Sequence, residues 1–332
     1  MAKNVLTYAE AIKEGIREEM RRDKSVFVMG EDIHISNTTV TRGLIDEFGE
    51  ERIKQMPICE LGFSAAAVGA SVTGMRPVVE IMYSDFLLLA ADPICNQAAK
   101  LRYVSGGQFH APVTYRVASS GMGAGGAHHS QSLEALPLHF PGLKVIYPST
   151  AYDAKGLIKS AIRDEDPVVF FEHKLLYSVK EEIDEEEYVI PIGKGIIRRE
   201  GKDLTLVSYG NMARLSLEVA EELAKEENID VEVYDPRSLR PFDYVQLLKS
   251  IEKTGKLIIV EEDTKIGGVG AEIAATIAEE GLFLLEAPIK RIAGKETPAP
   301  AGKRGHSFVI PNKEQIKQTI KDYLSKYGMK EE

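Results

Sequence analysis

Apolar and polar positions along the first half of the chain alternate between a helical and a strand-like period. The segment TYAEAIKEGIREEMRRD opens with a capping-box pattern, Thr7 with Glu10 three residues later. Its apolar side chains fall on one helical stripe, formed by Ile12, Ile16 and Met20. The β-branched and aromatic run VFVMGED follows directly. We therefore predict a helix from Thr7 and then a buried strand.

The same order of helix and strand repeats up to about residue 175. Further strands are expected at RPVVEIM (76–82), VTYRVAS (113–119), KVIYPS (144–149) and VVFFEH (168–173), with helices at 62–74, 92–103 and 152–163. These strands are apolar on both faces, which is typical of a parallel sheet covered by helices on both sides. The first half is therefore predicted to be a doubly wound α/β domain.

A second, smaller α/β unit is expected after an acidic connector. The stretch SVKEEIDEEEYVIPIGKG, from Ser178, has little helical periodicity and is interpreted as a solvated linker. Strand-like runs and helical patterns then resume, and the glycine-rich VEEDTKIGGVG (260–270) is interpreted as a strand-to-helix turn because its glycines lack dinucleotide-binding spacing. We predict a first doubly wound unit at 1–180, a linker at 181–202 and a second, smaller doubly wound domain at 203–330.

Composition narrows the class of protein. The chain has 332 residues, of which 44% are hydrophobic and 28% charged, as expected for about two globular domains. A net charge of −10 argues against nucleic-acid and anionic-membrane partners, which need clustered Lys and Arg. No stretch has the length of a signal peptide core or a membrane span, so we expect a cytoplasmic protein. Cys59 and Cys95 lie in apolar segments and are expected to be buried free thiols.

Glu60 is an acid placed directly ahead of small and apolar residues, in PICELGFSAAAVGAS (57–71). The helix dipole stabilises a carboxylate in a first turn, which is one sufficient explanation. The run SAAAVGAS has little side-chain bulk, however, and would let another backbone approach closely, as at an interface. A carboxylate held there could bind a ligand nitrogen, so both interpretations stay open.

A glycine-rich segment, SSGMGAGGAHHSQS (119–132), carries the paired His128 and His129. It has neither a Walker lysine nor a dinucleotide fingerprint, so it is weak evidence for a phosphate loop. Adjacent histidines usually point in different directions; we expect at most one to act as a general acid or base, the alternative being a histidine bonded within its own loop. Tyr83 and Phe86 are candidates for an aromatic wall or for core packing.

Taken together, these stretches resemble the beta subunit of the first, decarboxylating component of 2-oxo acid dehydrogenase complexes, including acetoin dehydrogenase. The shared sequences are PICELGF, AAAVGAS, YSDF, NQAAKLRY, HSQS, PGLKVIYPS, YDAKGLIKSAIRDEDPVVFFEHKLLY and YDPRSLRPFD, in one order over nearly the whole chain. The resemblance implies a thiamine-diphosphate-dependent enzyme built from a pyrimidine-binding domain and a transketolase C-terminal-like domain.

The resemblance also implies roles for individual residues. The acid matching Glu60 hydrogen-bonds the aminopyrimidine ring of the cofactor, the aromatic matching Phe86 lies against that ring, and Ile58 lines the pocket beside it. The histidine matching His129 faces the reacting group and takes part in proton or acetyl transfer. Glu31 matches an acid in the polar tunnel that links paired active sites in some members.

Partners and metals follow from what this chain lacks. The GDG sequence with which thiamine enzymes hold the diphosphate and Mg²⁺ does not occur here. The resemblance therefore implies an alpha subunit that supplies this half of the site, in an α2β2 heterotetramer, and a lipoyl acyltransferase that receives the acyl group. In some relatives a potassium ion is held by backbone carbonyls matching Ala111, Val113, Thr114, Ala161, Asp164 and Asp166.

The substrate stays open among pyruvate, a branched-chain 2-oxo acid and acetoin. Two other functions are considered: the C-terminal half of a split transketolase-type synthase, and a non-catalytic scaffold. The first would be favoured by basic residues near HHSQS, where no phosphate-binding basic cluster is found. The second does not explain why Glu60, Phe86 and His129 occur together.

Overall fold

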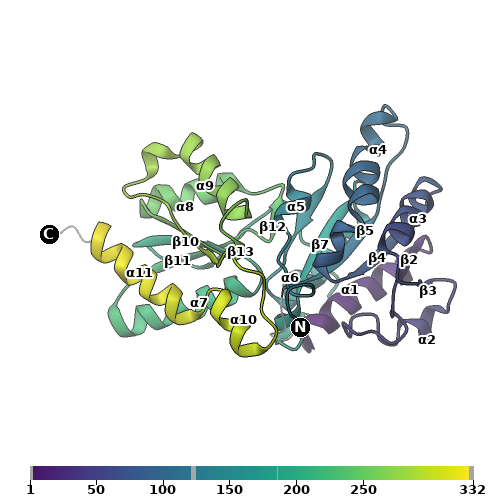
Figure 1. Cartoon of the computed structure of the whole chain (residues 1–332), viewed down its shortest axis with the longest axis horizontal. Helices are drawn as coiled ribbons and strands as arrows, with labels where there is room; N and C mark the ends of the chain where they lie inside the picture. Colours follow the sequence, from purple (N-terminus) through teal and green to yellow (C-terminus); the bar gives the residue numbers. More distant parts are fainter. Residues whose placement is uncertain (1–2, 121–124, 185, 329–332) are drawn as a thin grey trace.

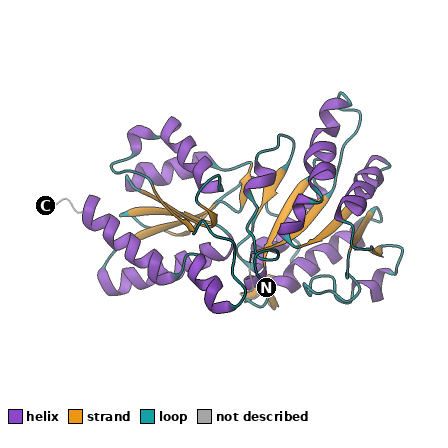
Figure 2. Ribbon diagram, in the orientation of Figure 1, coloured by secondary structure: helices purple, strands orange, loops and turns teal. Residues whose placement is uncertain are grey.

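The computed structural model describes residues 3–120, 125–184 and 186–328, and arranges them as two α/β units side by side (Figures 1 and 2). The strands are β1 (Lys3–Thr7), β2 (Val26–Gly30), β3 (Ile53–Gln55), β4 (Arg76–Met82), β5 (Thr114–Ser119), β6 (Lys144–Ile146), β7 (Val168–His173), β8 (Lys180–Asp184), β9 (Ile196–Arg199), β10 (Leu204–Ser208), β11 (Val231–Asp235), β12 (Ser238–Arg240), β13 (Leu257–Thr264) and β14 (Lys290–Gly294). The α-helices are α1 (Tyr8–Arg22), α2 (Leu44–Phe48), α3 (Glu60–Val72), α4 (Ala99–Val104), α5 (Ala135–Leu138), α6 (Ala151–Arg163), α7 (Gly210–Glu227), α8 (Tyr244–Thr254), α9 (Val269–Glu280), α10 (Lys303–Val309) and α11 (Lys313–Tyr327). Shorter helical turns are η1 (Ser84–Leu88), η2 (Asp92–Ala98), η3 (Lys174–Leu176) and η4 (Leu282–Leu284).

The first sheet has the strand order β12-β6-β7-β5-β4-β2-β3, and its neighbouring pairs are parallel except β12 with β6. The predicted strands RPVVEIM and VVFFEH coincide with β4 and β7. Strand β6 is shorter than predicted and ends at Ile146, before Pro148, which has no N–H for a sheet ladder. Strands β2, β5 and β7 are buried along their whole length, so the prediction of a covered parallel sheet is confirmed.

Helices α1 and α6 pack together on one face of this sheet. The capping box of Thr7 and Glu10 is present at the start of α1, and the predicted stripe of Ile12, Ile16 and Met20 is fully buried. The helices cross closely at Gly15, where an added Cβ would lie 2.5 Å from Cγ2 of Ile158. Glycine is therefore required at this position by the crossing itself.

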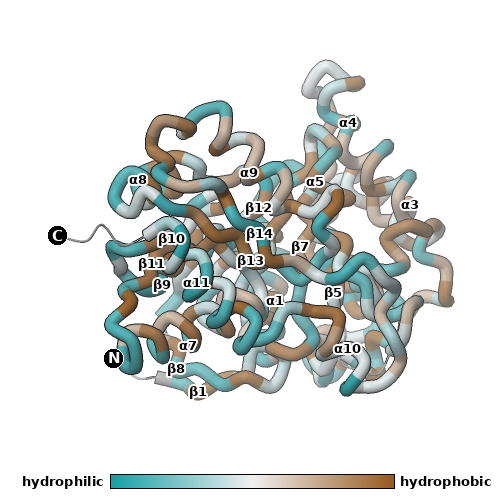
Figure 3. Tube along the Cα trace, turned by 60° about the vertical axis from the view of Figure 1, so that its left-hand side comes forward, coloured by the Kyte–Doolittle hydropathy of each residue, from teal (hydrophilic) through white to brown (hydrophobic). Residues whose placement is uncertain are grey.

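Helix α3, the π-helical turn η2 and α4 belong to the opposite face. Helix α3 begins at Glu60, two residues earlier than predicted, so the acid occupies its first position. The helix predicted at 92–103 is split, with η2 leading into α4. Colouring by hydropathy shows apolar residues along the central strands and also on α3 and α4 at the outer edge of the unit (Figure 3).

The second sheet has the order β14-β13-β10-β11-β9, parallel except for β9 with β11. Its strands are apolar on both faces, and α7 and α11 cover one of these faces, as Figure 1 shows. Helix α9 starts after Gly268, so the interpretation of VEEDTKIGGVG as a strand-to-helix turn is confirmed.

The segment predicted to be a solvated linker, residues 181–202, contains strand β9 and most of strand β8. Residues of β8 pair with β1, and β9 is an edge strand of the second sheet. The acidic composition that suggested a solvated linker is compatible with strands because both lie at sheet edges, where side chains face water. This segment therefore connects the two units, since β8 pairs with β1 of the first unit and β9 pairs with β11 of the second.

The two units share a core, and one strand that follows the second sheet in sequence joins the first sheet. β12, which follows β11 of the second sheet, pairs instead with β6 of the first. Tyr147 of the first unit packs on Tyr209 of the second, with ring centroids 5.5 Å apart. Asp153 on α6 pairs with Arg237 at 3.0 Å and also with Arg198 of β9. Packing and buried ion pairs therefore fix the relative orientation of the units.

Candidate functional site

The candidate residues gather at the carboxyl edge of the first sheet. Glu31, Tyr83, Ser120 and Lys174 directly follow β2, β4, β5 and β7, which are neighbours in the sheet. In open parallel sheets ligands bind at this edge, where loops connect the strands to their helices. The first sheet therefore supplies the floor of a candidate site.

Two carboxyl groups at this edge, those of Glu31 and Glu60, lie close enough to interact. Glu60 is 4% exposed and Glu31 is half-buried. Burial, and next the negative charge of Glu60, raise the pKa of Glu31. Within the described residues, the buried Oε2 of Glu31 has no hydrogen-bond partner. Since buried polar atoms are normally paired, a hydrogen-bond donor from outside the described residues would complete this site.

An aromatic cluster lies beside these acids. The ring of His129 meets Phe86 edge-on, with centroids 5.4 Å apart, and Tyr83 at 5.8 Å. His129 and His128 are both exposed, while Tyr83 and Phe86 are half-buried. The structure therefore brings Phe86 and His129 together as one wall, with the histidine open to solvent.

Three side chains from two elements, η1 and η3, bind the loop that carries His129. Ser84 donates to the carbonyl of Gln131, and the side-chain amide of Gln131 donates to Asp85 at 2.8 Å. Lys174 donates to the carbonyl of His129, also at 2.8 Å. Residues 121–124 of the glycine-rich segment lie outside the described residues.

An apolar surface surrounds Glu60. Ile58 is 82% exposed, and the α3 side chains that share this surface are small or apolar: Leu61, Ala65, Ala66, Gly69 and Val72. Cys59 is exposed as well, so the prediction of two buried thiols is wrong for this residue and confirmed only for Cys95, whose pKa burial raises to about 11. The apolar sequence around Cys59 forms a surface rather than a core, which is typical of an interaction site.

A buried ionic network lies beneath the site. Arg116 on β5 is 1% exposed and binds both oxygens of Glu172 at 2.6 and 2.8 Å, and Glu80 at 2.6 Å. The second oxygen of Glu80 accepts from Thr38 at 2.9 Å. Since Thr38 lies in the loop that follows Glu31, the network connects that loop to the centre of the sheet.

A crevice between the two units opens beside the histidine loop. It has a volume of about 520 Å³ and is lined by His128 and Gln131 on one side and by Asp263 and residues 294–299 on the other. Burial raises the pKa of Asp263 to about 6. His128, and not His129, is the histidine that lines this crevice.

Glu262 of the second unit fixes the strand ends that bear the site. Its carboxylate accepts from Ser120, at the end of β5, and lies 2.6 Å from Nε2 of His173, at the end of β7. Nδ1 of His173 accepts from the backbone N–H of Leu175, so Nε2 carries the proton given to Glu262. The second unit thereby positions the loops on both sides of the site.

Two further buried carboxyl groups flank Tyr209 where the units meet. The Tyr209 hydroxyl lies 3.0 Å from Glu134 and 3.4 Å from Glu261, which also accepts from the N–H of Gly270 at the start of α9. Burial raises the pKa of Glu261 to about 7 and that of Glu134 well above its usual value. Such groups bind protons at neutral pH that solvent-exposed acids would release.

The residues expected to supply carbonyls to a potassium ion do come together. Pairing of β5 with β7 places Val113 beside Val168, whose N–H donates to the Val113 carbonyl at 3.0 Å. The remaining members of the set lie at the start of β5, the end of α6 and the loop before β7: Ala111, Thr114, Ala161, Asp164 and Asp166.

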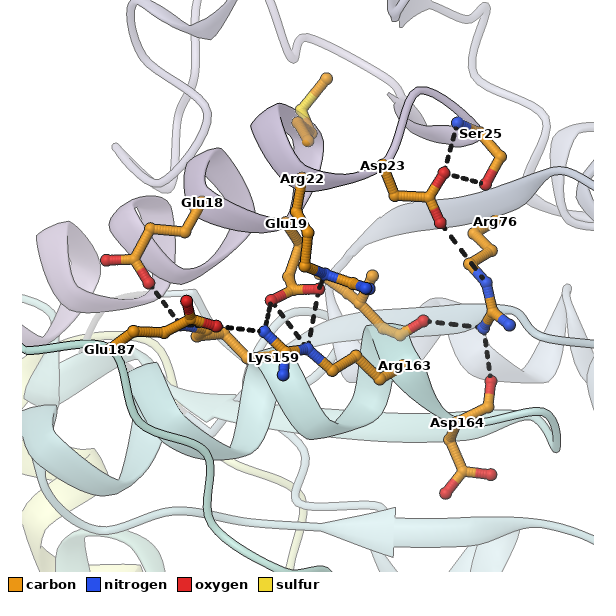
Figure 4. A network of polar contacts seen from close by, with 12 residues as sticks. Glu18, Glu19, Arg22, Asp23, Ser25, Arg76, Lys159, Arg163, Asp164 and Glu187 are labelled. Carbon is orange, nitrogen blue, oxygen red and sulfur yellow. Dashed lines mark hydrogen bonds and ion pairs between the residues drawn. The ribbon is translucent and has the colours of Figure 1, made fainter.

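Cations of the protein itself already occupy this loop. Arg76 donates to the carbonyls of Asp164 and Ile162 at 3.0 and 3.1 Å, as Figure 4 shows. Lys144 binds the Asp164 carboxylate at 2.6 Å, and Arg102 binds Asp166 at 3.0 Å. A potassium ion at the Asp164 carbonyl would share this oxygen with the Arg76 guanidinium, and the carbonyl set stays a prediction.

Lys174, Glu262 and Ser120 were not predicted from the sequence. The available signals were a lysine directly after a mainly apolar strand, in VVFFEHK, and three consecutive acids closing KLIIVEED. Within the described residues, no group of three or more His, Cys, Asp or Glu side chains is arranged to hold a metal ion. The described helices also include none that is long and apolar enough to cross a membrane.

Known families match the chain over both units. The pyrimidine binding domain of transketolase matches residues 4–180, and the transketolase C-terminal domain matches residues 193–316. The 2-oxoisovalerate dehydrogenase subunit beta of Bacillus subtilis is 42% identical over 323 residues, 96% of this chain and 98% of the relative. The beta subunit of acetoin:2,6-dichlorophenolindophenol oxidoreductase from the same organism is 41% identical, over 94% of this chain and 95% of the relative. The pyruvate dehydrogenase E1 component subunit beta of Staphylococcus epidermidis is 43% identical, over 96% and 98%.

Solved structures show the same fold at lower identity. A split-gene transketolase, an inactive beta4 tetramer, superposes with a TM-score of 0.79 at 24% identity, over 96% of this chain and 98% of that one. Transketolase from Leishmania mexicana gives 0.73 at 16% identity, over 98% of this chain and 47% of that one. The predicted fold class and the resemblance are both confirmed: the chain belongs to the transketolase-like family of beta subunits of 2-oxo acid and acetoin dehydrogenase E1 components.

Proposed function

We propose that this chain supplies the pyrimidine-binding half of a thiamine-diphosphate site, in an enzyme that decarboxylates a 2-oxo acid or cleaves acetoin and passes the acyl group to lipoamide. The observation that carries the proposal is the pair of Glu60, which is buried, and Glu31, which is half-buried and has an unpartnered oxygen. Glu31 acts on Tyr83, which with Phe86 lies against His129. A flat, nitrogen-bearing ring satisfies both features, because it stacks on the aromatic ring and donates to the acids.

When bound, thiamine diphosphate would supply the electron sink that cleavage of a carbon–carbon bond next to a carbonyl requires. Glu60 would hold a proton between its carboxylate and a ring nitrogen, and its burial makes this hydrogen bond stronger than it would be in water. Phe86 would orient the ring, and Ile58 would cover its edge. His129, exposed at the mouth of the site, would move a proton to or from the reacting oxygen.

The apolar surface around Glu60 supports the proposal of an alpha-subunit partner. A carboxylate used in catalysis needs exclusion of water, but Ile58 and the small face of α3 are open to solvent in this chain. An alpha subunit that covers this surface would close the site and bring the diphosphate and Mg²⁺, for which the GDG sequence is missing here. An α2β2 heterotetramer with a lipoyl acyltransferase partner follows from the family.

We keep 1–180 as the proposed pyrimidine-binding domain and 203–330 as the C-terminal domain, with the intervening strands as their connection. A split transketolase function is not favoured, since identity to that class is 24% against about 42% to dehydrogenase beta subunits. The likeness to transketolases shows a shared fold and no shared substrate.

The proposal is tested by reconstituting the chain with its alpha partner, thiamine diphosphate and Mg²⁺. Dye reduction is measured with pyruvate, branched-chain 2-oxo acids and acetoin, and the best substrate identifies the enzyme. Glu60→Gln should lower kcat by roughly 10²- to 10⁴-fold, as expected for loss of a proton-transfer group. Glu50→Gln, at an exposed acid outside the site, is the matched control. A folded complex that turns over none of the substrates would instead favour a scaffold.

A further inference from the structure

We propose that Lys174 is a positioning residue, which holds the backbone of His129 against the ring of Tyr83 and thereby fixes the histidine at the mouth of the site. The proposal rests on the proposed function, because it takes His129 as the group that faces the substrate. It assigns a role to a lysine that touches neither the acids nor the proposed cofactor ring.

The geometry around Lys174 is that of a clamp. The residue follows β7 at the start of η3 and is 5% exposed. Its Nζ lies 2.8 Å from the carbonyl oxygen of His129 and 4.1 Å from the centroid of the Tyr83 ring. One ammonium group thus joins the histidine loop to Tyr83, through an ionic hydrogen bond to the His129 carbonyl and a cation–π contact with the Tyr83 ring.

His129 depends on this clamp for its place. Within the described residues its ring has no hydrogen-bond partner, and its aromatic contacts are edge-on contacts with Tyr83 and Phe86. The other polar restraints from η1 act two residues later, where Ser84 and Asp85 bind Gln131. Without Lys174 the backbone at His129 would keep only the hydrogen bond from its N–H to the carbonyl of Gly126 in the same loop, while the loop stayed attached at Gln131.

The anchor itself is held by charge. Two carboxylates act on Lys174, Asp85 from η1 and Glu262 from β13, and both favour its charged form. Burial outweighs them and lowers the pKa of Lys174 to about 8. A neutral amine still donates a hydrogen bond but does not attract the Tyr83 ring, so the clamp should weaken as pH rises through about 8.

The test uses the reconstituted complex with three variants of this chain. Lys174→Met keeps the stem without the charge, Lys174→Arg keeps a cation, and Lys225→Met changes an exposed lysine on α7 as a control. Because a small displacement of a reacting group is costly, we expect Lys174→Met to lower kcat by roughly tenfold or more with little change in KM. The arginine variant should stay within about threefold of the wild type. The wild type should lose kcat above about pH 8, and this loss should be absent in the methionine variant.

A second measurement does not depend on activity. Hydrogen exchange followed by mass spectrometry, on the full chain at pH 7, should show faster exchange of residues 125–133 in Lys174→Met than in the wild type, with Lys174→Arg and Lys225→Met unchanged. Wild-type exchange and a wild-type pH profile in the methionine variant would overturn the proposal. If the wild-type complex turns over no substrate, the proposed function fails and the exchange result alone decides whether Lys174 positions the loop.

Discussion

Replacing Arg116 by methionine removes the cation at the centre of the buried network beneath the site. Three ionic hydrogen bonds are lost, two to Glu172 and one to Glu80. At about 1.5–3 kcal/mol each they sum to roughly 4.5–9 kcal/mol, but the stranded carboxylates can take up protons, which limits the loss. We expect the free energy of unfolding to fall by about 3–5 kcal/mol, the range measured when one partner of a buried pair is removed.

The pH dependence of this loss identifies its cause. Burial already raises the pKa of Glu172, and Arg116 opposes that shift. In Arg116→Met the folded state would therefore bind a proton that the unfolded chain releases above about pH 4.3, so stability falls as pH rises from there to the raised folded pKa. The variant should be less destabilised at pH 5.5 than at pH 8 in urea denaturation, measured against the wild type at each pH.

A triple variant separates stranded charge from lost packing. Arg116→Met combined with Glu80→Gln and Glu172→Gln leaves no unpaired carboxylate in the network and should recover more than half of the lost stability, since neutral replacement of a whole buried network is often tolerated. If the triple variant is as unstable as the single one at every pH, the loss comes from packing and the electrostatic reasoning is wrong.

Two further measurements test other parts of the structure. Because burial raises the pKa of Glu261 to about 7, its contribution to stability should be fully present below about pH 4.3 and decline by up to about 3 kcal/mol as pH rises to 7; Glu261→Gln should flatten that part of the profile, and an unchanged slope would contradict it. Because Arg76 binds the Asp164 carbonyl, exchanging sodium for potassium should leave the unfolding midpoint of the wild type unchanged, whereas the substitution Arg76→Gln should lower that midpoint. A higher midpoint of the wild type in potassium than in sodium would instead support a bound potassium ion.

Local patterns were enough to predict α1 and the main strands of the first unit, whereas the short elements β1, β3, α2 and α5 were not predicted. The capping box of Thr7 and Glu10 and the period of Ile12, Ile16 and Met20 are properties of neighbouring residues, and they recur unchanged in α1. The strands were equally accessible because a short, mainly apolar run rich in β-branched and aromatic residues is typical of a buried strand. Errors fell at the boundaries, such as the early end of β6.

The candidate site was only partly accessible in this way. Glu60, Phe86 and His129 were named through resemblance, and the structure adds that Phe86 and His129 are in contact. Burial of Cys59 was predicted wrongly because an apolar stretch has the same sequence whether it faces a core or a partner. The roles of Lys174 and Glu262 depend on partners 45 and 142 residues away in sequence, and no local pattern contains that information.

Because β12 covers the edge strand β6 but lies far later in the sequence, the edge of the first sheet stays unpaired during part of synthesis. A ribosome produces the first sheet up to β7 well before Ser238 exists, and until then β6 is an open edge strand with unpaired backbone groups. Such an edge is a template for pairing with other chains, so the nascent first half spends part of its synthesis in an aggregation-prone form. Residues 238–240 end that exposure, and the chain protects its own edge only once about three quarters of it has been made.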